Sequence, residues 1–336
     1  MQLNLTRETV TYYSGNPLER CGYCRDDDAF LAAAKSHETA RFILFNNLDP
    51  QVKHNEETHK LEFDYWNGAQ LAPFATEECT MVFLGLDTSV PGLCHKQLNG
   101  QPVWAVDISG IEGIDKTGCR NLRMAKVSRK DAAIFAQAKQ TLDWIARNKF
   151  CAACGSPTHP IHAGYKLSCA NTNCNSKKTL NNIVFPRTDA SVIMAVLDFK
   201  RENILLGRGK RFPPSMYSCL AGFLEPGESI EDCVRREVLE EAGVKVGTVF
   251  LHSSQPWPYP ANIMIGCIAQ VADESEESHR ISLEFDPELA DAQWVSLARV
   301  RKLCAGESEE DMFVPPRTAI AWALLDAASK LAYSKF

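Results

Sequence analysis

The chain contains 336 residues, which is enough for two or three domains with cores of their own. Hydrophobic residues make up 45% and charged residues 23%, as in ordinary globular proteins. The net charge of −6 argues against a protein that coats nucleic acid through a basic surface, although a bound divalent cation still permits an anionic substrate.

The first 147 residues combine strand-like and helical patterns. Runs rich in β-branched and aromatic residues predict three strands, at 41–46, 81–86 and 103–109. A helix is expected to follow Ser128, which forms a plausible capping pair with Asp131, because apolar residues then recur at helical spacing. We therefore predict an N-terminal α+β domain over residues 1–147, with this helix packed on it.

The next segment, residues 148–182, has few apolar residues and is rich in cysteine. Two close pairs of thiols are present, Cys151, Cys154, Cys169 and Cys174. Zinc prefers four soft ligands in a tetrahedron, and a closed four-sulfur site stabilises a segment too small for a core. We predict a zinc ribbon with a structural zinc, and four unrelated core cysteines are the alternative. The separate pair Cys21 and Cys24 is interpreted as incidental.

The remaining residues, 183–336, predict a mixed α/β domain. Strands are expected at 191–197, 204–207, 218–223, 263–271 and 292–297. Helices are expected from about Ser229 to Ala242 and from about Arg317 to Tyr333. Segment 254–262 contains three prolines in five residues, so we expect a rigid extended loop there and not a strand.

Negative charge lies on the apolar side of the first of these helices. At 100° per residue, Cys233, Val234 and Val238 define an apolar stripe, and Glu237 and Glu241 project from the same stripe. Carboxylates placed against an apolar sheet would each cost several kcal/mol of desolvation free energy. A hard divalent cation offsets that cost, because it binds carboxylate and phosphate oxygens together. We therefore predict a metal site here, and a solvated glutamate face is the alternative.

Residues 222–244 resemble the Nudix box, G-x5-E-x7-REUxEExGU with U aliphatic, at every fixed position. The resemblance implies a strand–loop–helix element within an α/β/α sandwich, and substrates that contain a nucleoside diphosphate. It also implies that Glu228 and Arg236 pair to hold the loop. The implied ligands of a catalytic Mg²⁺ or Mn²⁺ are Glu237, Glu240 and Glu241.

Segment 254–262 is similar to the SQPWPFPxS signature of the NADH pyrophosphatase (NudC-type) family, with Tyr259 for the Phe and Asn262 for the final Ser. The cysteine cluster upstream of the box is typical of the same family, as is the join Phe185-Pro186-Arg187. The family more often has Tyr at the first place of that join, and it usually has Pro where this chain has Ala190.

This resemblance covers about residues 144–323 and implies roles for further side chains. Phe185 and Phe223 would stack on a base of the dinucleotide, and core packing is the alternative. Glu288 and the backbone carbonyl of Ala221 would be additional metal ligands, while a surface glutamate is the alternative for Glu288. The implied substrate-binding residues are Phe185, Ala221, Phe223, Gln255, Trp257, Tyr259 and Ala321.

The implied reaction is hydrolysis of the pyrophosphate bond of NADH or NAD⁺ to NMN(H) and AMP, through a metal-activated water with one glutamate as general base. NAD-capped RNA presents the same diphosphate, and the resemblance favours a homodimer. Two alternatives stay open: another Nudix specificity, such as ADP-ribose or capped RNA, and a non-catalytic zinc and Nudix binding module. For Arg208, Lys210 and Arg211, which precede the box, phosphate contacts and a solvated loop both stay open.

No apolar run approaches the roughly 18–20 residues that a membrane span needs, and the first residues lack a signal-peptide pattern. We therefore expect no membrane partner and a reducing compartment without disulfides. The ending Ser334-Lys335-Phe336 matches the peroxisomal S-K-L address in two of three positions. Peroxisome and cytoplasm are both expected locations, because a frayed end is the alternative to an import signal.

Overall fold

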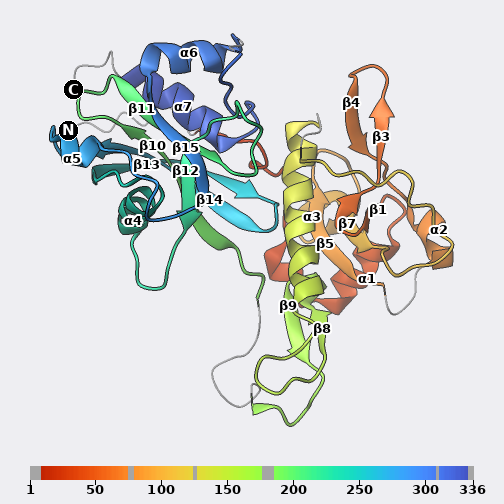
Figure 1. Cartoon of the computed structure of the whole chain (residues 1–336). Helices are drawn as coiled ribbons and strands as arrows, with labels where there is room; N and C mark the ends of the chain where they lie inside the picture. Colours follow the sequence, from red (N-terminus) through yellow and green to blue (C-terminus); the bar gives the residue numbers. More distant parts are fainter. Residues whose placement is uncertain (1–8, 75–78, 124–126, 176–184, 308–309, 332–336) are drawn as a thin grey trace. The chain divides into compact units, whose positions relative to one another are not determined.

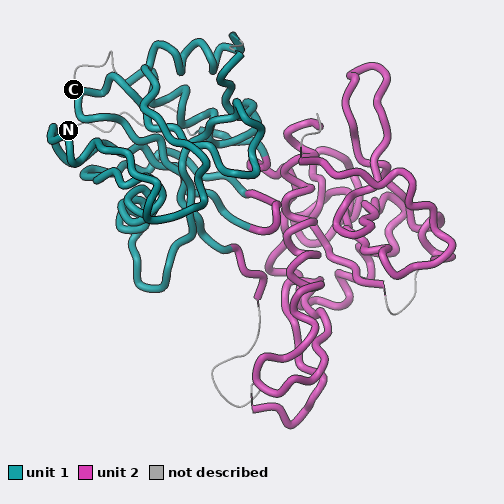
Figure 2. Tube along the Cα trace, viewed as in Figure 1, with its two compact units in different colours: residues 1–12, 189–256, 262–336 teal, residues 13–188, 257–261 magenta. Residues whose placement is uncertain are grey.

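The computed structural model describes residues 9–74, 79–123, 127–175, 185–307 and 310–331. By its internal contacts the chain divides into two compact units, which Figure 2 colours separately. Unit 1 comprises residues 1–12, 189–256 and 262–336, and unit 2 comprises residues 13–188 and 257–261. None of the helices in the described ranges combines the length and the hydropathy that a membrane span requires.

Unit 2 is built around a five-stranded sheet in the order β2-β1-β7-β5, with β6 paired to β7. Its strands are β1 (Arg41–Asn46), β2 (Asp49–Pro50), β5 (Met81–Asp87), β6 (Leu93–His95) and β7 (Leu98–Asp107). β7 runs parallel to β1 and antiparallel to β5. The three strands predicted in this part of the sequence are confirmed, although β7 both begins and ends earlier than predicted.

The helices of unit 2 pack around this sheet. Besides the hairpin that carries the cysteines, described below, the remaining elements of unit 2 are η1 (Gly22–Cys24), α1 (Asp28–Ser36), β3 (Val52–Asn55), β4 (Lys60–Phe63), α2 (Gly68–Leu71), η2 (Ala72–Phe74) and α3 (Arg129–Arg147). α3 begins as predicted, because the Ser128 hydroxyl oxygen accepts a hydrogen bond from the Asp131 N–H at 3.0 Å. Cys21 and Cys24 are buried in the apolar core of this unit beside Phe30.

Unit 1 contains a six-stranded sheet in the order β13-β14-β10-β11-β15, with β12 paired to β10. Its strands are β10 (Asp189–Leu197), β11 (Asn203–Gly209), β12 (Leu220–Phe223), β13 (Val246–Trp257), β14 (Asn262–Val271) and β15 (Leu289–Ser296). Its helices are α4 (Ile230–Ala242), α5 (Glu276–His279), α6 (Leu297–Ala305) and α7 (Ile320–Leu331). The predicted strands and both predicted helices of this part are therefore present, with shifted ends.

Alternation along the central strand β10 explains the layering of unit 1. Side chains of Ile193 and Leu197 pack in one apolar cluster with residues of α6 and α7. Those of Val192, Met194 and Val196 point to the other face and pack with α4. Because β10 is apolar at both sets of positions, both faces of the sheet are covered by helices, as Figure 1 shows. The predicted α/β/α sandwich is confirmed.

The loop predicted at 254–262 is wrong in its first half. β13 continues through Gln255 and Pro256 to Trp257, and only the following residues form the turn to β14. β13 ends the path of strands in this sheet, with β14 as its neighbour. Proline is tolerated in such a strand, because its missing N–H is not needed by a second neighbour.

The Gln255 side chain is fully buried in unit 1. Its amide nitrogen donates hydrogen bonds to the carbonyl oxygens of Tyr12 at 2.9 Å and Thr318 at 3.1 Å. Its amide oxygen accepts one from the N–H of Ile320, the first residue of α7, at 2.9 Å. This side chain therefore connects β13 to the start of α7, and it does not lie where a substrate could reach it.

We expect Gln255→Ala to lower the free energy of unfolding by about 3 kcal/mol, because three buried backbone groups lose their partner. Urea-induced unfolding measures this change. The exposed Glu274→Ala in the same unit is the control and should leave the unfolding midpoint in place. Equal stability of the two variants would contradict the structural role of Gln255.

Candidate active site

α4 is positioned by its caps and its apolar stripe. The Ser229 hydroxyl oxygen accepts a hydrogen bond from the Asp232 N–H at 3.1 Å, and the helix ends at Gly243, whose φ of 71° favours glycine. The stripe packs against the sheet through residues that are fully buried, Cys233, Val234 and Val238. This attachment carries Glu241 into the protein, where 5% of the residue is exposed.

The three glutamates of α4 that were predicted to bind metal differ in exposure as their helical positions predict. The Glu237 side chain is 13% exposed and the Glu240 side chain is 49% exposed. The cysteine quartet of unit 2 is the single group of three or more potential metal-binding side chains that the described ranges gather within 4.8 Å. The glutamates of α4 are therefore less tightly gathered than the cysteines.

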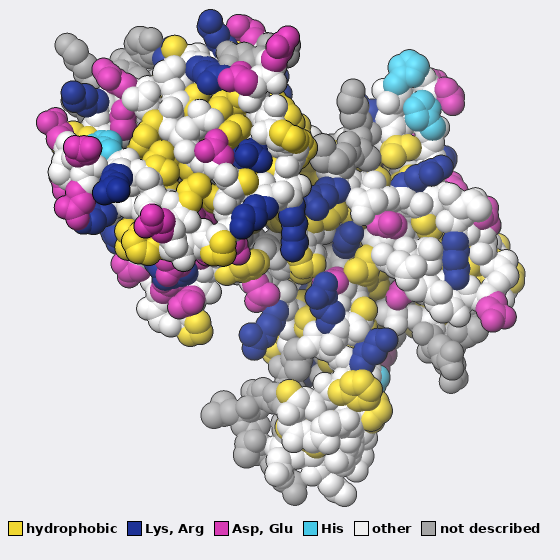
Figure 3. All heavy atoms as spheres, in the orientation of Figure 1, with side chains coloured by type: hydrophobic (Ala, Val, Ile, Leu, Met, Phe, Trp, Pro, Cys, Tyr) yellow, Lys and Arg dark blue, Asp and Glu magenta, His cyan; other side chains and the backbone are white. Residues whose placement is uncertain are grey.

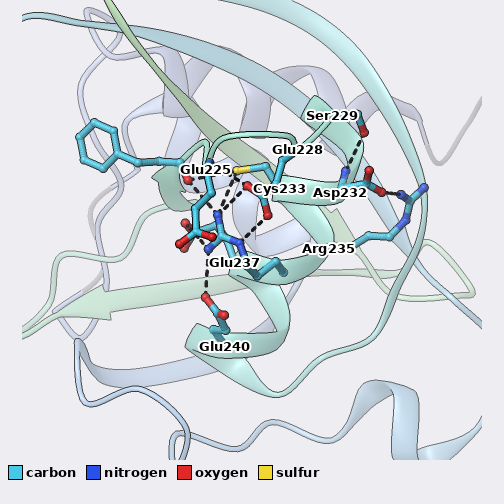
Figure 4. A network of polar contacts seen from close by, with 10 residues as sticks. Glu225, Glu228, Ser229, Asp232, Cys233, Arg235, Glu237 and Glu240 are labelled. Atoms are coloured by element: carbon cyan, nitrogen blue, oxygen red, sulfur yellow. Dashed lines mark hydrogen bonds and ion pairs between the residues drawn. The ribbon is translucent and has the colours of Figure 1, made fainter.

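Arg236 is the centre of a polar network, and its partners Glu228, Glu237 and Glu240 are labelled in Figure 4. Its Nε and Nη2 atoms donate hydrogen bonds to both carboxylate oxygens of Glu228, at 2.6 and 2.9 Å. This pairing, which the sequence predicted, holds the pKa of Glu228 down at about 2. Nη2 also donates to the Phe223 carbonyl at 2.8 Å. Arg236 therefore fastens the loop between β12 and α4 to the helix.

The same guanidinium reaches the glutamates of α4. Arg236 Nη1 lies 2.9 Å from Glu237 Oε1 and 3.0 Å from Glu240 Oε2. The Glu241 side chain makes no hydrogen bond or ion pair with any residue in the described ranges. Burial raises the pKa of Glu241 to about 8, and the negative charges of Glu237 and Glu288 add to the rise. Glu241 is buried whereas Glu240 and Glu288 are exposed, and a carboxylate set of this kind is suited to a hard divalent cation.

Gly222 allows the sheet and α4 to approach closely. A Cβ atom added at this position would lie 1.9 Å from Glu237 Cδ, so any other residue would displace that carboxylate. Gly222 precedes Phe223 at the end of β12, which pairs with β10. The close approach of the Glu237 carboxylate therefore requires glycine at position 222.

A cavity of about 480 Å³ in unit 1 brings three predicted ligands together. Ala221, Glu241 and Glu288 line it, with Lys210, Arg211 and Phe212 among its other lining residues. A larger cavity of about 920 Å³ lies in unit 2 near Lys35 and contains none of the predicted site residues. Glu237 and Glu240 do not line the smaller cavity, since Arg236 holds them beside it.

The two predicted stacking residues are both accessible. Phe185, in unit 2, is 61% exposed, and Phe223, at the end of β12, is 55% exposed. Core packing, the alternative reading of both residues, does not apply. Ala321 is buried in the apolar cluster of α6 and α7, where its carbonyl oxygen lies 4.0 Å from the Cys219 sulfur.

Trp257 and Tyr259 belong to unit 2, where they form an aromatic cluster with Tyr13 and α3. The Tyr13 ring lies 6.0 Å from that of Trp257 and 6.1 Å from that of Tyr259. Tyr259 also contacts the Phe135 ring at 6.2 Å, and Lys139 Nζ lies 5.0 Å from its centroid. Both predicted substrate-binding rings are therefore packed side chains of unit 2, and each remains partly exposed.

The cysteine quartet lies around the hairpin of β8 (Thr158–Ile161), η3 (His162–Gly164) and β9 (Lys166–Cys169). The Sγ atoms of Cys151 and Cys174 are 3.8 Å apart, and those of Cys154 and Cys169 are 3.5 Å apart. Ligands of a tetrahedral zinc are about 3.8 Å apart, because each Zn–S bond is about 2.3 Å. The quartet therefore fits a closed, structural zinc site.

Sequence reasoning missed two features of the cavity. Phe212 lines it, but a lone Phe in a loop gives no signal of that role. For Lys210 and Arg211 the sequence left phosphate contacts and a solvated loop both open, and their place in the cavity depends on the turn after β11. The contact of Arg236 with Glu240 could have been predicted from their i,i+4 spacing on the helix, whereas that with the adjacent Glu237 could not.

Three family models match successive parts of the chain. Residues 39–144 match the NADH pyrophosphatase-like rudimentary NUDIX domain, and residues 146–177 match the NADH pyrophosphatase zinc ribbon domain. Residues 187–315 match the NUDIX domain. A NUDIX hydrolase structure from Nitrosomonas europaea is 17% identical, with a TM-score of 0.38, and the match covers 54% of this chain and 90% of that one.

Similar proteins extend along most of the chain. The human NAD-capped RNA hydrolase NUDT12 is 35% identical over 96% of this chain and 74% of its own length. The NAD-capped RNA hydrolase of Schizosaccharomyces pombe is 33% identical over 94% and 92%. NAD-capped RNA hydrolase NudC of Pseudomonas entomophila is 33% identical over 70% and 81%. With the domains and the intact box, these similarities show that the chain belongs to the NudC-type NADH pyrophosphatase family of the Nudix hydrolases.

Proposed function

We propose that the chain hydrolyses the pyrophosphate bond of NADH or NAD⁺ to give NMN(H) and AMP. We propose that it hydrolyses the same bond in NAD-capped RNA. The observation that carries the proposal is the buried carboxylate of Glu241, which faces the same cavity as Glu288 and has no cationic partner in the described ranges. The names of the matched relatives support a substrate that contains NAD.

The glutamates would hold Mg²⁺ or Mn²⁺, because carboxylate oxygens are ligands that both ions prefer. Such a cation supplies charge neutralisation at the phosphate and acidifies water. Glu237 and Glu240 would leave Arg236 to join Glu241 and Glu288 as ligands, and Ala221, whose carbonyl the resemblance implies as a further ligand, lines the same cavity. One of the glutamates accepts the proton of the attacking water.

The arrangement favours catalysis over a passive binding module. A module without chemistry has no need for a buried acidic side chain that lacks a partner, since such a group costs stability. Acidic side chains lie between basic ones over the face of unit 1 in Figure 3, so that face shows no continuous basic surface for a long nucleic acid. Recognition of a capped RNA would then rest on its dinucleotide end.

Two features stay predictions of the sequence. The homodimer rests on family resemblance. The ending Ser334-Lys335-Phe336 lies outside the described residues, so peroxisomal import and a cytoplasmic location both stay open as proposals.

We expect Glu241→Gln to reduce NADH hydrolysis about a thousandfold, because a cation ligand and a possible proton acceptor are lost together. Chromatographic separation of NMNH and AMP measures the rate with Mg²⁺ or Mn²⁺. Glu231→Gln, on the first turn of the same helix, is the matched control and should retain the rate. A Glu241→Gln enzyme of full activity would disprove the catalytic assignment.

We expect Gly222→Ala to preserve the fold and to weaken Mn²⁺ binding about tenfold or more, because the added methyl group displaces the Glu237 carboxylate. Calorimetric titration with Mn²⁺ measures the affinity, and circular dichroism checks the fold. Gly110→Ala, which would meet no atom within 4 Å, is the control. Unchanged affinity in Gly222→Ala would show that Glu237 is not a ligand.

We expect the purified protein to contain about one zinc per chain, and Cys154→Ser to lose most of it, because a closed site needs all four sulfurs. Elemental analysis measures the zinc content. The exposed Cys94→Ser should retain the metal. Zinc retention by Cys154→Ser would exclude Cys154 as a ligand.

A further inference from the structure

We propose that the turn Lys210–Phe212, directly after β11, is a substrate subsite. In this proposal Lys210 and Arg211 bind non-bridging oxygens of the diphosphate, and Phe212 stacks on the nicotinamide ring, which ADP-ribose lacks. The inference rests on the proposed function and extends it, because it assigns side chains to parts of the substrate that the Nudix box leaves without a partner.

The turn lies on the same cavity as the acidic residues. Lys210, Arg211 and Phe212 line the 480 Å³ cavity together with Glu241 and Glu288. The Lys210 N–H donates a hydrogen bond to the Glu288 carbonyl at 3.3 Å, which ties the turn to the segment that carries this glutamate. The Phe212 N–H donates to the Gly209 carbonyl at 2.9 Å and closes the turn. Substrate held at the glutamates would therefore meet these side chains.

The positive charges of the turn are available to an anion. Neither Lys210 nor Arg211 makes a side-chain hydrogen bond or ion pair with a residue in the described ranges, although two glutamates line the same cavity. They are the basic residues among those that line it. Lysine offers a point charge and arginine a fork of donors, and both suit phosphate oxygens. A merely solvated loop would not need to line the cavity.

The Phe212 ring is available to a flat ligand. Phe212 is 40% exposed, although its ring lies against Gly209, where an added Cβ would be 3.9 Å from ring atoms. Pro213 and Pro214 follow and restrict the backbone. NAD(H) contains two flat rings, and the family resemblance assigns the exposed Phe223 of unit 1 to one of them. Phe212 offers an aromatic surface for the other ring beside the cavity, where stacking is favourable.

The test compares NADH, which has two rings, with ADP-ribose, which has the same diphosphate and one ring. Lys210→Gln and Arg211→Gln should each lower kcat/KM about tenfold for both substrates, because the diphosphate is shared. Phe212→Ala should lower kcat/KM for NADH about tenfold, mainly through KM, and leave ADP-ribose unchanged. Phe212→Tyr should restore the value for NADH. Lys302→Gln, an exposed cation of α6, is the matched control, and thermal unfolding checks each variant.

Calorimetric titration with inorganic pyrophosphate and Mn²⁺ separates this inference from the proposed function. Lys210→Gln and Arg211→Gln should weaken pyrophosphate binding whichever nucleotide the wild-type enzyme hydrolyses. Unchanged pyrophosphate affinity would overturn the phosphate assignment, even if NADH is the substrate. An equal loss of both substrates in Phe212→Ala, or no loss, would overturn the ring assignment. A wild-type enzyme that binds pyrophosphate through these residues but does not hydrolyse NADH would disprove the proposed function alone.

Discussion

Negative charge on the sheet-facing side of α4 is the constraint on which the rest of unit 1 depends. The apolar contacts of Val234 and Val238 fix the helix to the sheet, and the same contacts withdraw its carboxylates from bulk water. One guanidinium, that of Arg236, then serves both the helix and the loop before it. Glu241 lies beyond the reach of that charge, and burial raises its pKa to about 8, so a bound cation would offset the cost of ionising it.

Local signals in the sequence were sufficient for the elements that build the site. Ser229 and Gly243 mark the ends of α4 because caps and left-handed termini depend on neighbouring residues alone. The apolar runs of the central strands are equally local, since a strand covered on both faces needs no alternation. The spacing of the four cysteines predicted a group of sulfurs, because a tetrahedral metal limits how the chain can place its ligands.

Features that depend on distant parts of the chain could not be predicted. The prolines near Trp257 indicated a loop, but the position of β13 at the end of its sheet lets the strand continue through them. The motif around Gln255 resembled a substrate contact, yet its amide satisfies backbone groups of Tyr12 and α7. α6 was not predicted, although Leu297, Val300 and Leu303 recur at helical spacing, because nine residues are too few for a stable helix alone and packing on α7 stabilises it.

The division of the chain also determines the order in which a ribosome can complete each part. Residues 13–188 emerge as one continuous stretch that contains the β1–β7 sheet and all four zinc ligands. Tyr13 and Phe135, however, gain the Tyr259 ring as a further neighbour only when that residue has been synthesised. Until then part of the surface of α3 stays uncovered on the nascent protein. Unit 2 therefore finishes folding only after strands β10 to β13 of the unit 1 sheet have been synthesised.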